Sequence, residues 1–170
     1  NQLLIRDYQY CQKVQDMLAD RPGEWEIRRS REMVFLPHVS RFDFLQDERI
    51  YQILKDWMAN VPVVKSVMKI DPEKGNIWGL AARKEDLDLL RIPVNEVVET
   101  IPGEKALLYY YKSPVLLVQD ENAKNEKHAA IRLLRQLHLQ MAGPYYRVSL
   151  MPSDWTNAAG NQYGCYVMMV

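Results

Sequence analysis

Cysteine and glycine are scarce in this 170-residue chain, and each shortage excludes a class of protein. The two cysteines, Cys11 and Cys165, lie at opposite ends, so they cannot form a disulfide framework, and we expect an intracellular, reducing compartment. Seven glycines leave no long flexible linker, and no internal repeat is visible. No apolar run reaches the roughly 18 residues of a membrane span, so we expect no membrane association.

Catalytic and metal-binding patterns are missing as well. The three histidines, His38, His128 and His138, have no Cys, His or carboxylate cluster at ligand spacing. Residues 75–79 contain two glycines but lack the lysine of a phosphate-binding loop, and no nucleophile elbow is present. We therefore expect no catalytic residues, no metal and no cofactor.

The charge balance excludes a general polyanion binder. Lys+Arg and Asp+Glu both number 22, so the net charge is zero, although a local basic patch stays compatible with that sum. The length and the 48% apolar content suit one globular domain over residues 1–170, with a sub-boundary near 102–105 as an option. Because the first residue is Asn, we expect a domain excised from a longer protein.

Hydrophobic periodicity predicts helices and strands that mix without strict alternation. The predicted helices span residues 2–19, 47–58, 84–90 and 122–141, with a further helical turn or two at 94–101. The predicted strands span 25–40, 63–70, 76–82, 106–112, 115–119, 145–150 and 163–170. This order predicts an α+β fold: a single compact domain with a mixed or mostly antiparallel sheet and three main helices. The apolar run 166–170 predicts a central or helix-covered strand.

One short motif suggests phosphate chemistry. His38 and Ser40 are two residues apart on an extended segment, so their side chains share a face. This His-x-Ser pattern resembles one half of the 2H phosphoesterase family, whose two such motifs act on RNA ends or cyclic phosphates. Arg147, two residues before Ser149, stands where the second histidine would be. The resemblance implies a degenerate relative in which His38, Ser40, Arg147 and Ser149 bind a phosphate without cleaving it. The alternative is that His38 is an ordinary strand residue.

A second pattern is electrostatic. Lys124, His128, Arg132 and Arg135 follow spacings of four, four and three, which place them on one side of the predicted helix 122–141. This helix is similar to the last helix of a double-stranded-RNA-binding domain, where basic side chains meet phosphates. A solvated helix face is the alternative.

Tyr109 and Tyr111 share one face of the predicted strand 106–112, where they could stack on unpaired bases or pack a core edge. Taken together, the patterns favour a non-catalytic RNA-associated binding module that acts with protein partners in a larger complex. Two alternatives are a protein–protein adaptor and a degenerate 2H-phosphoesterase-like domain acting on RNA ends.

Overall fold

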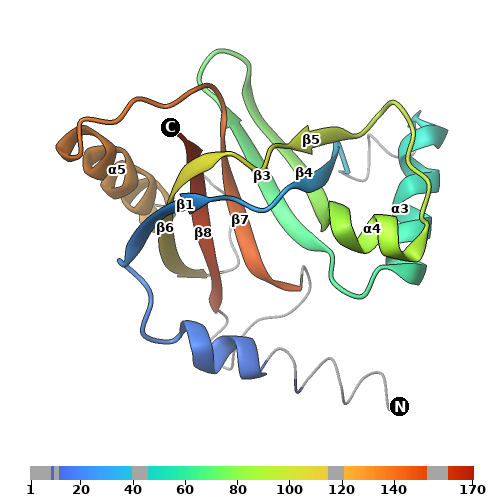
Figure 1. Ribbon diagram of the computed structural model, residues 1–170, viewed down its shortest axis with the longest axis horizontal. Helices are drawn as coiled ribbons and strands as arrows, with labels where there is room; N and C mark the ends of the chain where they lie inside the picture. The colour runs from blue at the N-terminus through green and yellow to red at the C-terminus, as the bar shows by residue number, and fades with distance from the viewer. Residues whose placement is uncertain (1–8, 10–11, 40–45, 115–120, 153–160) are drawn as a thin grey trace.

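Eight strands form one curled antiparallel sheet, in the order β1-β6-β8-β7-β3-β4-β2-β5 (Figure 1). The computed structural model describes Gln9 and residues 12–39, 46–114, 121–152 and 161–170. The strands are β1 Trp25–Arg29, β2 Met33–Pro37, β3 Lys65–Asp71, β4 Gly75–Arg83, β5 Glu99–Ile101, β6 Lys105–Pro114, β7 Tyr145–Pro152 and β8 Asn161–Met169. The described helices are residues 12–18, α3 Glu48–Asn60, α4 Lys84–Leu90 and α5 Glu121–Gln136. The predicted single α+β domain is confirmed.

The sheet contains a structural duplication that the sequence does not reveal. The series β2-α3-β3-β4 and β6-α5-β7-β8 are both a strand, a helix and a hairpin. In the sheet, these strands lie in the mirrored order β6-β8-β7 and β3-β4-β2. The two units therefore meet where β7 pairs with β3, around the pair Val67 and Val148.

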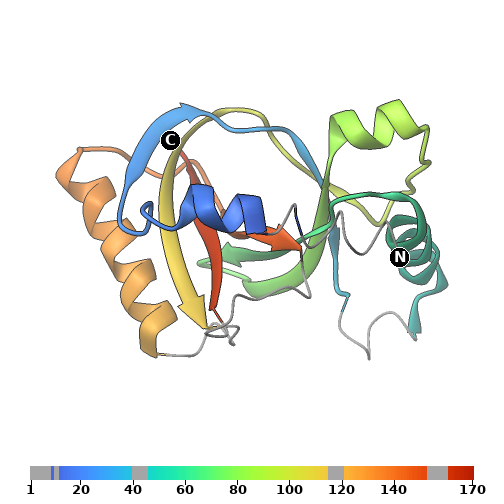
Figure 2. The same ribbon diagram turned by 90° about the horizontal axis from the view of Figure 1, so that it is seen from below.

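The sheet curls where the bent segment that contains β1 and β2 pairs with the bent segment that contains β5 and β6. β1 pairs with β6, and β2 pairs with β5, which leads directly into β6. Ser30 holds the bend: its N–H donates to the Glu104 carbonyl at 2.8 Å, and its hydroxyl donates to the Pro102 carbonyl at 2.8 Å. The inner face of the curl buries an apolar core that includes Phe35 and Val67. The helix at 12–18 lies across one end of the curl and packs Leu18 against this core (Figure 2).

The outer face of the sheet carries the other helices at its two ends (Figures 1 and 2). α5 covers β6 and β8 through Ala130 and Leu134. α3 and α4 cover β2 and β4, with Trp57 of α3 and Leu87 of α4 in one core. The middle strands β3 and β7 lie between these two helical ends, which makes the outer side of β3 and β7 the place where the two units face each other.

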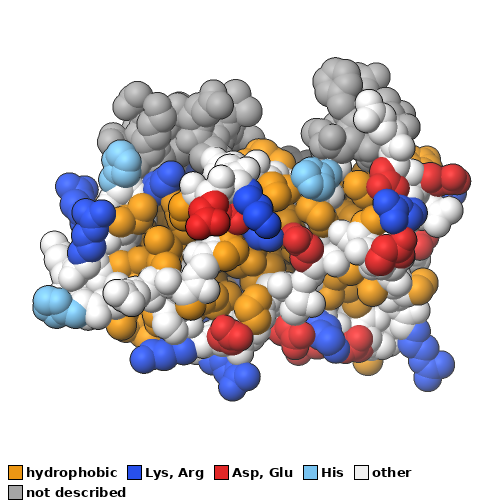
Figure 3. Space-filling model, turned by 90° about the horizontal axis from the view of Figure 1, so that it is seen from above, with side chains coloured by type: hydrophobic (Ala, Val, Ile, Leu, Met, Phe, Trp, Pro, Cys, Tyr) orange, Lys and Arg blue, Asp and Glu red, His pale blue; other side chains and the backbone are white. Residues whose placement is uncertain are grey.

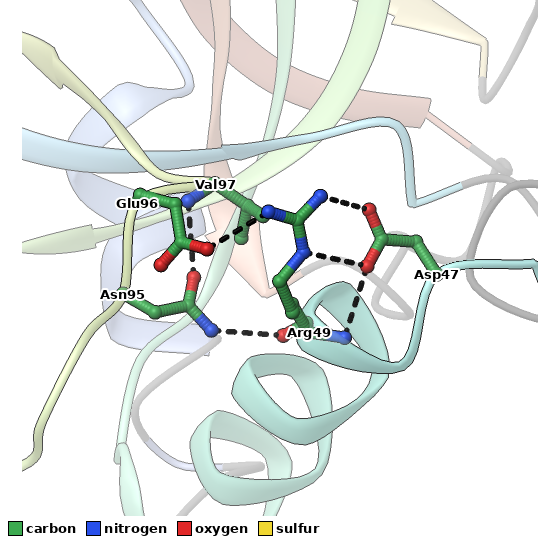
Figure 4. Close-up of polar contacts among 5 residues, drawn as sticks. All are labelled: Asp47, Arg49, Asn95, Glu96 and Val97. Atoms are coloured by element: carbon green, nitrogen blue, oxygen red, sulfur yellow. Dashed lines mark hydrogen bonds and ion pairs between the residues drawn. The ribbon is translucent and has the colours of Figure 1, made fainter.

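A network of hydrogen bonds and ion pairs links the start of α3 to the segment before β5 (Figure 4). Asp47 caps α3 by accepting the Arg49 backbone N–H at 3.0 Å. The Arg49 guanidinium donates to Asp47 and to Glu96, at 3.0 and 2.8 Å, and Asn95 donates to the Arg49 carbonyl. The hydrogen bond from the Arg49 side chain lowers the pKa of the Asp47 carboxyl.

Three element predictions are wrong in detail. Residues 94–101 contain no helix; they end in β5, because Glu99–Ile101 pairs with β2. α5 ends at Gln136, five residues before the predicted end, since His138 adopts φ 55° and closes a Schellman motif with Leu139 N–H bonded to the Leu134 carbonyl. β6 continues through Ser113 and Pro114, where a break was predicted, and the predicted strand at 115–119 lies outside the described residues.

Candidate binding surfaces

The outward side of α5 carries basic side chains. His128, Arg132 and Arg135 are exposed, while Ala130 and Leu134 on the opposite side are buried. Lys124 lies on the same helix, but its side chain is outside the described part of the structure. Because the helix repeats every 3.6 residues, these positions keep the basic groups away from the sheet.

Several other cations of the domain are neutralised by neighbouring carboxylates. Arg21, Arg28, Arg49 and Arg83 all form ion pairs with neighbouring carboxylates. Among the described side chains, Arg132 and Arg135 have no ion-pair partner. Figure 3 shows blue and pale blue side chains gathered at the α5 end of the molecule, whereas red ones gather toward its middle and opposite end. The domain therefore has a local positive surface despite its zero net charge.

The two tyrosines predicted to extend this surface lie beneath α5. Tyr111 is 3% exposed and Tyr109 is half-buried, and both belong to the core that contains Leu134. Tyr111 cannot stack on a base while α5 covers it. The exposed aromatic residue at this end is instead Trp25, which lies directly opposite Tyr109 on the edge strand β1. The exposure of Trp25 could have been predicted from the sequence, because Trp25 alternates with charged residues on a predicted strand.

Arg147 lies in the middle of the outer face. Strand pairing aligns it with Met68 on one side and Tyr166 on the other. The same row continues from Met68 to Trp78 and from Tyr166 to Tyr109. We call this set the Arg147 row: Trp78, Met68, Arg147, Tyr166 and Tyr109. It crosses the junction of the two strand–helix–hairpin units.

In the Arg147 row, the guanidinium lies over buried tyrosine rings. The Arg147 guanidinium carbon lies 4.2 Å from the centroid of the Tyr111 ring, and the Tyr111 and Tyr166 rings are 5.4 Å apart. Tyr111 and Tyr166 are buried, Arg147 is half-buried, and Trp78 at the end of the row is 43% exposed. Withdrawing a guanidinium from water is costly, and the ring face offsets part of that cost. The row thus presents a fixed positive charge beside a solvent-exposed indole.

The structure brings together only some residues of the predicted phosphate site. Arg147 and Ser149 share the outer side of β7, and Ser149 is buried. His38 follows β2, with φ 59° and its N–H bonded to the Trp78 carbonyl at 2.9 Å. β4 and β3 separate His38 from β7, roughly 14 Å along the sheet at three strand spacings. Ser40 lies outside the described residues.

Two clefts lie elsewhere on the described surface. One of about 500 Å³ is lined by Arg31, Glu32, Arg83, Lys84, Glu85 and Asp88. Its charges largely satisfy one another, since Arg83 pairs with Glu85 and Lys84 pairs with Asp88. The other, of about 370 Å³, is lined by Asp56, Asn60 and residues 90–93. Within the described ranges, no three Cys, His, Asp or Glu side chains gather as a metal ion would require, and no helix is long and apolar enough to cross a membrane.

Comparison with known proteins gives relatives in fold only. No protein-family model matches the chain, and no curated protein matches its sequence. Among solved structures, the C-terminal domain of EcmrR is 10% identical with a TM-score of 0.56, covering 86% of this chain and 96% of that one. EcmrR in its complex with DNA (EcmrR-RPo) gives 11% identity and a TM-score of 0.51, covering 99% of this chain and 66% of that one. A hydrolase from Listeria innocua gives 11% identity and a TM-score of 0.50, covering 92% and 96%.

Proposed function

We propose that the domain is a non-catalytic binding module whose outer sheet face holds a small anionic ligand with a planar apolar body. The Arg147 guanidinium, fixed over Tyr111 at the junction of the two units, is the observation that carries this proposal. Guanidinium groups present a planar fork of N–H donors that matches carboxylate and phosphate oxygens. A half-buried arginine also binds an anion more strongly than an exposed one, because less water screens the charge.

The spacing of the Arg147 row indicates the shape of the ligand. Trp78 lies two strands from Arg147, roughly 10 Å along the sheet, and Met68 lies between them. Trp78 offers an exposed ring face to a planar group, while Met68 provides an adaptable apolar floor. The ligand class is therefore an aromatic carboxylate, sulfonate or phosphate about one or two rings long.

The same row explains why binding without catalysis is proposed. Its members carry no imidazole, carboxylate or thiol, the groups that most often serve as general acid, base or nucleophile. His38 is too far along the sheet to share one phosphate with Arg147. Of the described residues of the degenerate phosphate site inferred from the sequence, Arg147 and Ser149 lie on the same strand.

Replacing Arg147 should remove the contact with the anionic group of the ligand and leave the apolar contacts with the ligand in place. We expect Arg147→Met to weaken the binding of 2-naphthoate by about tenfold to a hundredfold, since a hydrogen bond to a charged group contributes about 1.5–3 kcal/mol. Isothermal titration calorimetry would measure this loss. Arg147→Met should bind the neutral methyl ester as well as the wild type does, and Arg29→Met, on the exposed edge strand, is the matched control. Equal binding of 2-naphthoate by wild type and Arg147→Met would refute the proposal.

A nucleic-acid-associated role is the second candidate, and the finer form we propose is RNA binding through α5 within a larger protein assembly. The favouring observation is the exposed pair Arg132 and Arg135, which have no ion-pair partner among the described residues. Cations that are not neutralised internally can release counterions from a phosphate backbone. EcmrR, one of the structural relatives, has been solved in complex with DNA.

Charge reversal on α5 should abolish this binding. We expect the double variant Arg132→Glu/Arg135→Glu to lose salt-dependent binding of labelled RNA in fluorescence anisotropy at about 50 and 200 mM salt. For the wild type, about four phosphate contacts would give a slope of log K against log salt near −3. Lys55→Glu/Lys74→Glu changes the charge equally at exposed positions on α3 and the β3–β4 turn, and should bind normally. DNA of the same sequence tests whether RNA is preferred. Identical binding by both double variants would exclude α5 as the surface.

A further inference from the structure

We infer that Trp25 on β1, beside the positive surface of α5, provides a stacking position for an unpaired base, so that the partner is single-stranded nucleic acid. This inference rests on the second candidate function above. It differs from the sequence-based expectation, which placed stacking on Tyr109 and Tyr111, because α5 covers these residues.

Strand alternation turns Trp25 outward. Glu26, the next residue, accepts the Tyr110 hydroxyl at 2.8 Å, and Tyr110 belongs to the inner core of the curl. Trp25 and Ile27 therefore lie on the outer side of β1, where they are 43% and 40% exposed. At 43% exposure, Trp25 leaves a large part of its side chain open to a partner.

Trp25 lies close to the helix that carries the cations. It is paired directly with Tyr109, and Tyr109 packs in the same cluster as Leu133 and Leu137 of α5. Directly opposite residues of paired strands have Cβ atoms about 5 Å apart. Figures 1 and 2, seen from two perpendicular directions, both show the beginning of β1 beside α5. One strand spacing thus separates the exposed ring from the residues under the basic helix.

Acidic groups near Trp25 do not oppose an incoming phosphate strongly. Glu24 pairs with Arg21 at 3.3 Å, and Glu26 pairs with Arg28 at 2.7 Å. Their negative charges are therefore balanced within the domain. The hydrogen bond from Arg28 also lowers the pKa of Glu26, in keeping with a paired carboxylate.

An indole beside a row of cations selects for unpaired bases. In a duplex the base faces are stacked on each other, and only the ends are accessible. α5 can contact the phosphates of a single-stranded nucleic acid while one of its bases stacks on Trp25. The structure therefore predicts that Trp25 contributes to single-strand affinity and not to duplex affinity.

Three single substitutions test this inference by fluorescence anisotropy with single-stranded and duplex RNA of about 12 nucleotides. We expect Trp25→Ala to weaken single-strand binding by about fivefold to a hundredfold and to leave duplex binding unchanged. Trp25→Phe, which keeps a ring, should retain most of the affinity. Tyr51→Ala removes a similarly exposed aromatic side chain from α3, away from both proposed surfaces, and should bind single-stranded RNA like the wild type.

The outcomes separate this inference from the candidate function on which it rests. If Arg132→Glu/Arg135→Glu abolishes binding and Trp25→Ala does not weaken it, the stacking position is refuted and the α5 surface stands. Equal losses for single strand and duplex in Trp25→Ala would also refute stacking. A wild-type domain that binds neither RNA at tens of micromolar would refute both.

Discussion

Removal of the last five residues, 166–170, should leave the chain without a cooperative unfolding transition. The first four of these residues, 166–169, belong to β8, which lies between β6 and β7, and Tyr166 and Met168 are 1% and 0% exposed. Four buried side chains at about 1.5–3 kcal/mol each amount to roughly 6–12 kcal/mol. A domain of this size has a total free energy of unfolding of about 5–15 kcal/mol, so the loss is comparable with that total.

Circular dichroism during heating would measure this effect. Deletion of Val170 alone is the matched control, because this residue is half-buried and follows β8. The control should keep a sharp transition close to that of the full chain. A similarly sharp transition after removal of all five residues would contradict the central position of β8.

Replacing Trp57 with alanine should be more destabilising than replacing either of the other described tryptophans, Trp25 and Trp78. Trp57 is fully buried between α3 and the outer side of β2 and β4, where it contributes to one core with Leu36 and Leu80. Truncating such a side chain leaves a cavity and costs about 3–5 kcal/mol. Urea denaturation should show a lower midpoint with an unchanged slope.

Two further variants serve as controls for Trp57→Ala: Trp78→Ala and Trp57→Phe. Trp78→Ala, at a 43% exposed position, should shift the free energy of unfolding by less than about 1 kcal/mol. Within the described structure, the buried Trp57 Nε1 has no hydrogen-bond partner, so Trp57→Phe removes an unsatisfied polar atom and should cost less than its lost area suggests. A Trp57→Ala loss no larger than that of Trp78→Ala would mean that α3 does not pack as described.

Local patterns identified most elements, because helices and hairpins depend on neighbouring residues. The predicted helix 47–58 corresponds to α3, and the predicted strands 63–70 and 76–82 correspond to β3 and β4. The end of α5 was predicted wrongly because His138 takes the left-handed position that glycine usually occupies in a Schellman motif. β5 was missed because its three residues are a strand only by pairing with β2.

The candidate sites required information that local patterns do not contain. The alignment of Arg147 with Met68 and Trp78 joins three strands, and no spacing along the chain encodes it. The basic residues of α5 could be found, since they follow helical periodicity within one element. Their relation to Tyr109 and Trp25 could not, because it depends on which strands α5 covers.

The bent pairing of β1 and β2 with β5 and β6 has a consequence for how fast the chain folds. The hydrogen bond between Tyr110 and Glu26 joins residues 84 positions apart, and that between Ser30 and Pro102 joins residues 72 apart. The β3–β4 and β7–β8 hairpins, by contrast, connect near neighbours and can form within microseconds. Closing the curl must wait until distant segments meet, and such high contact order places folding in the range of milliseconds to seconds. Until then, the edge of β6 that β1 will cover has no partner, and the chain is open to pairing with another copy of itself.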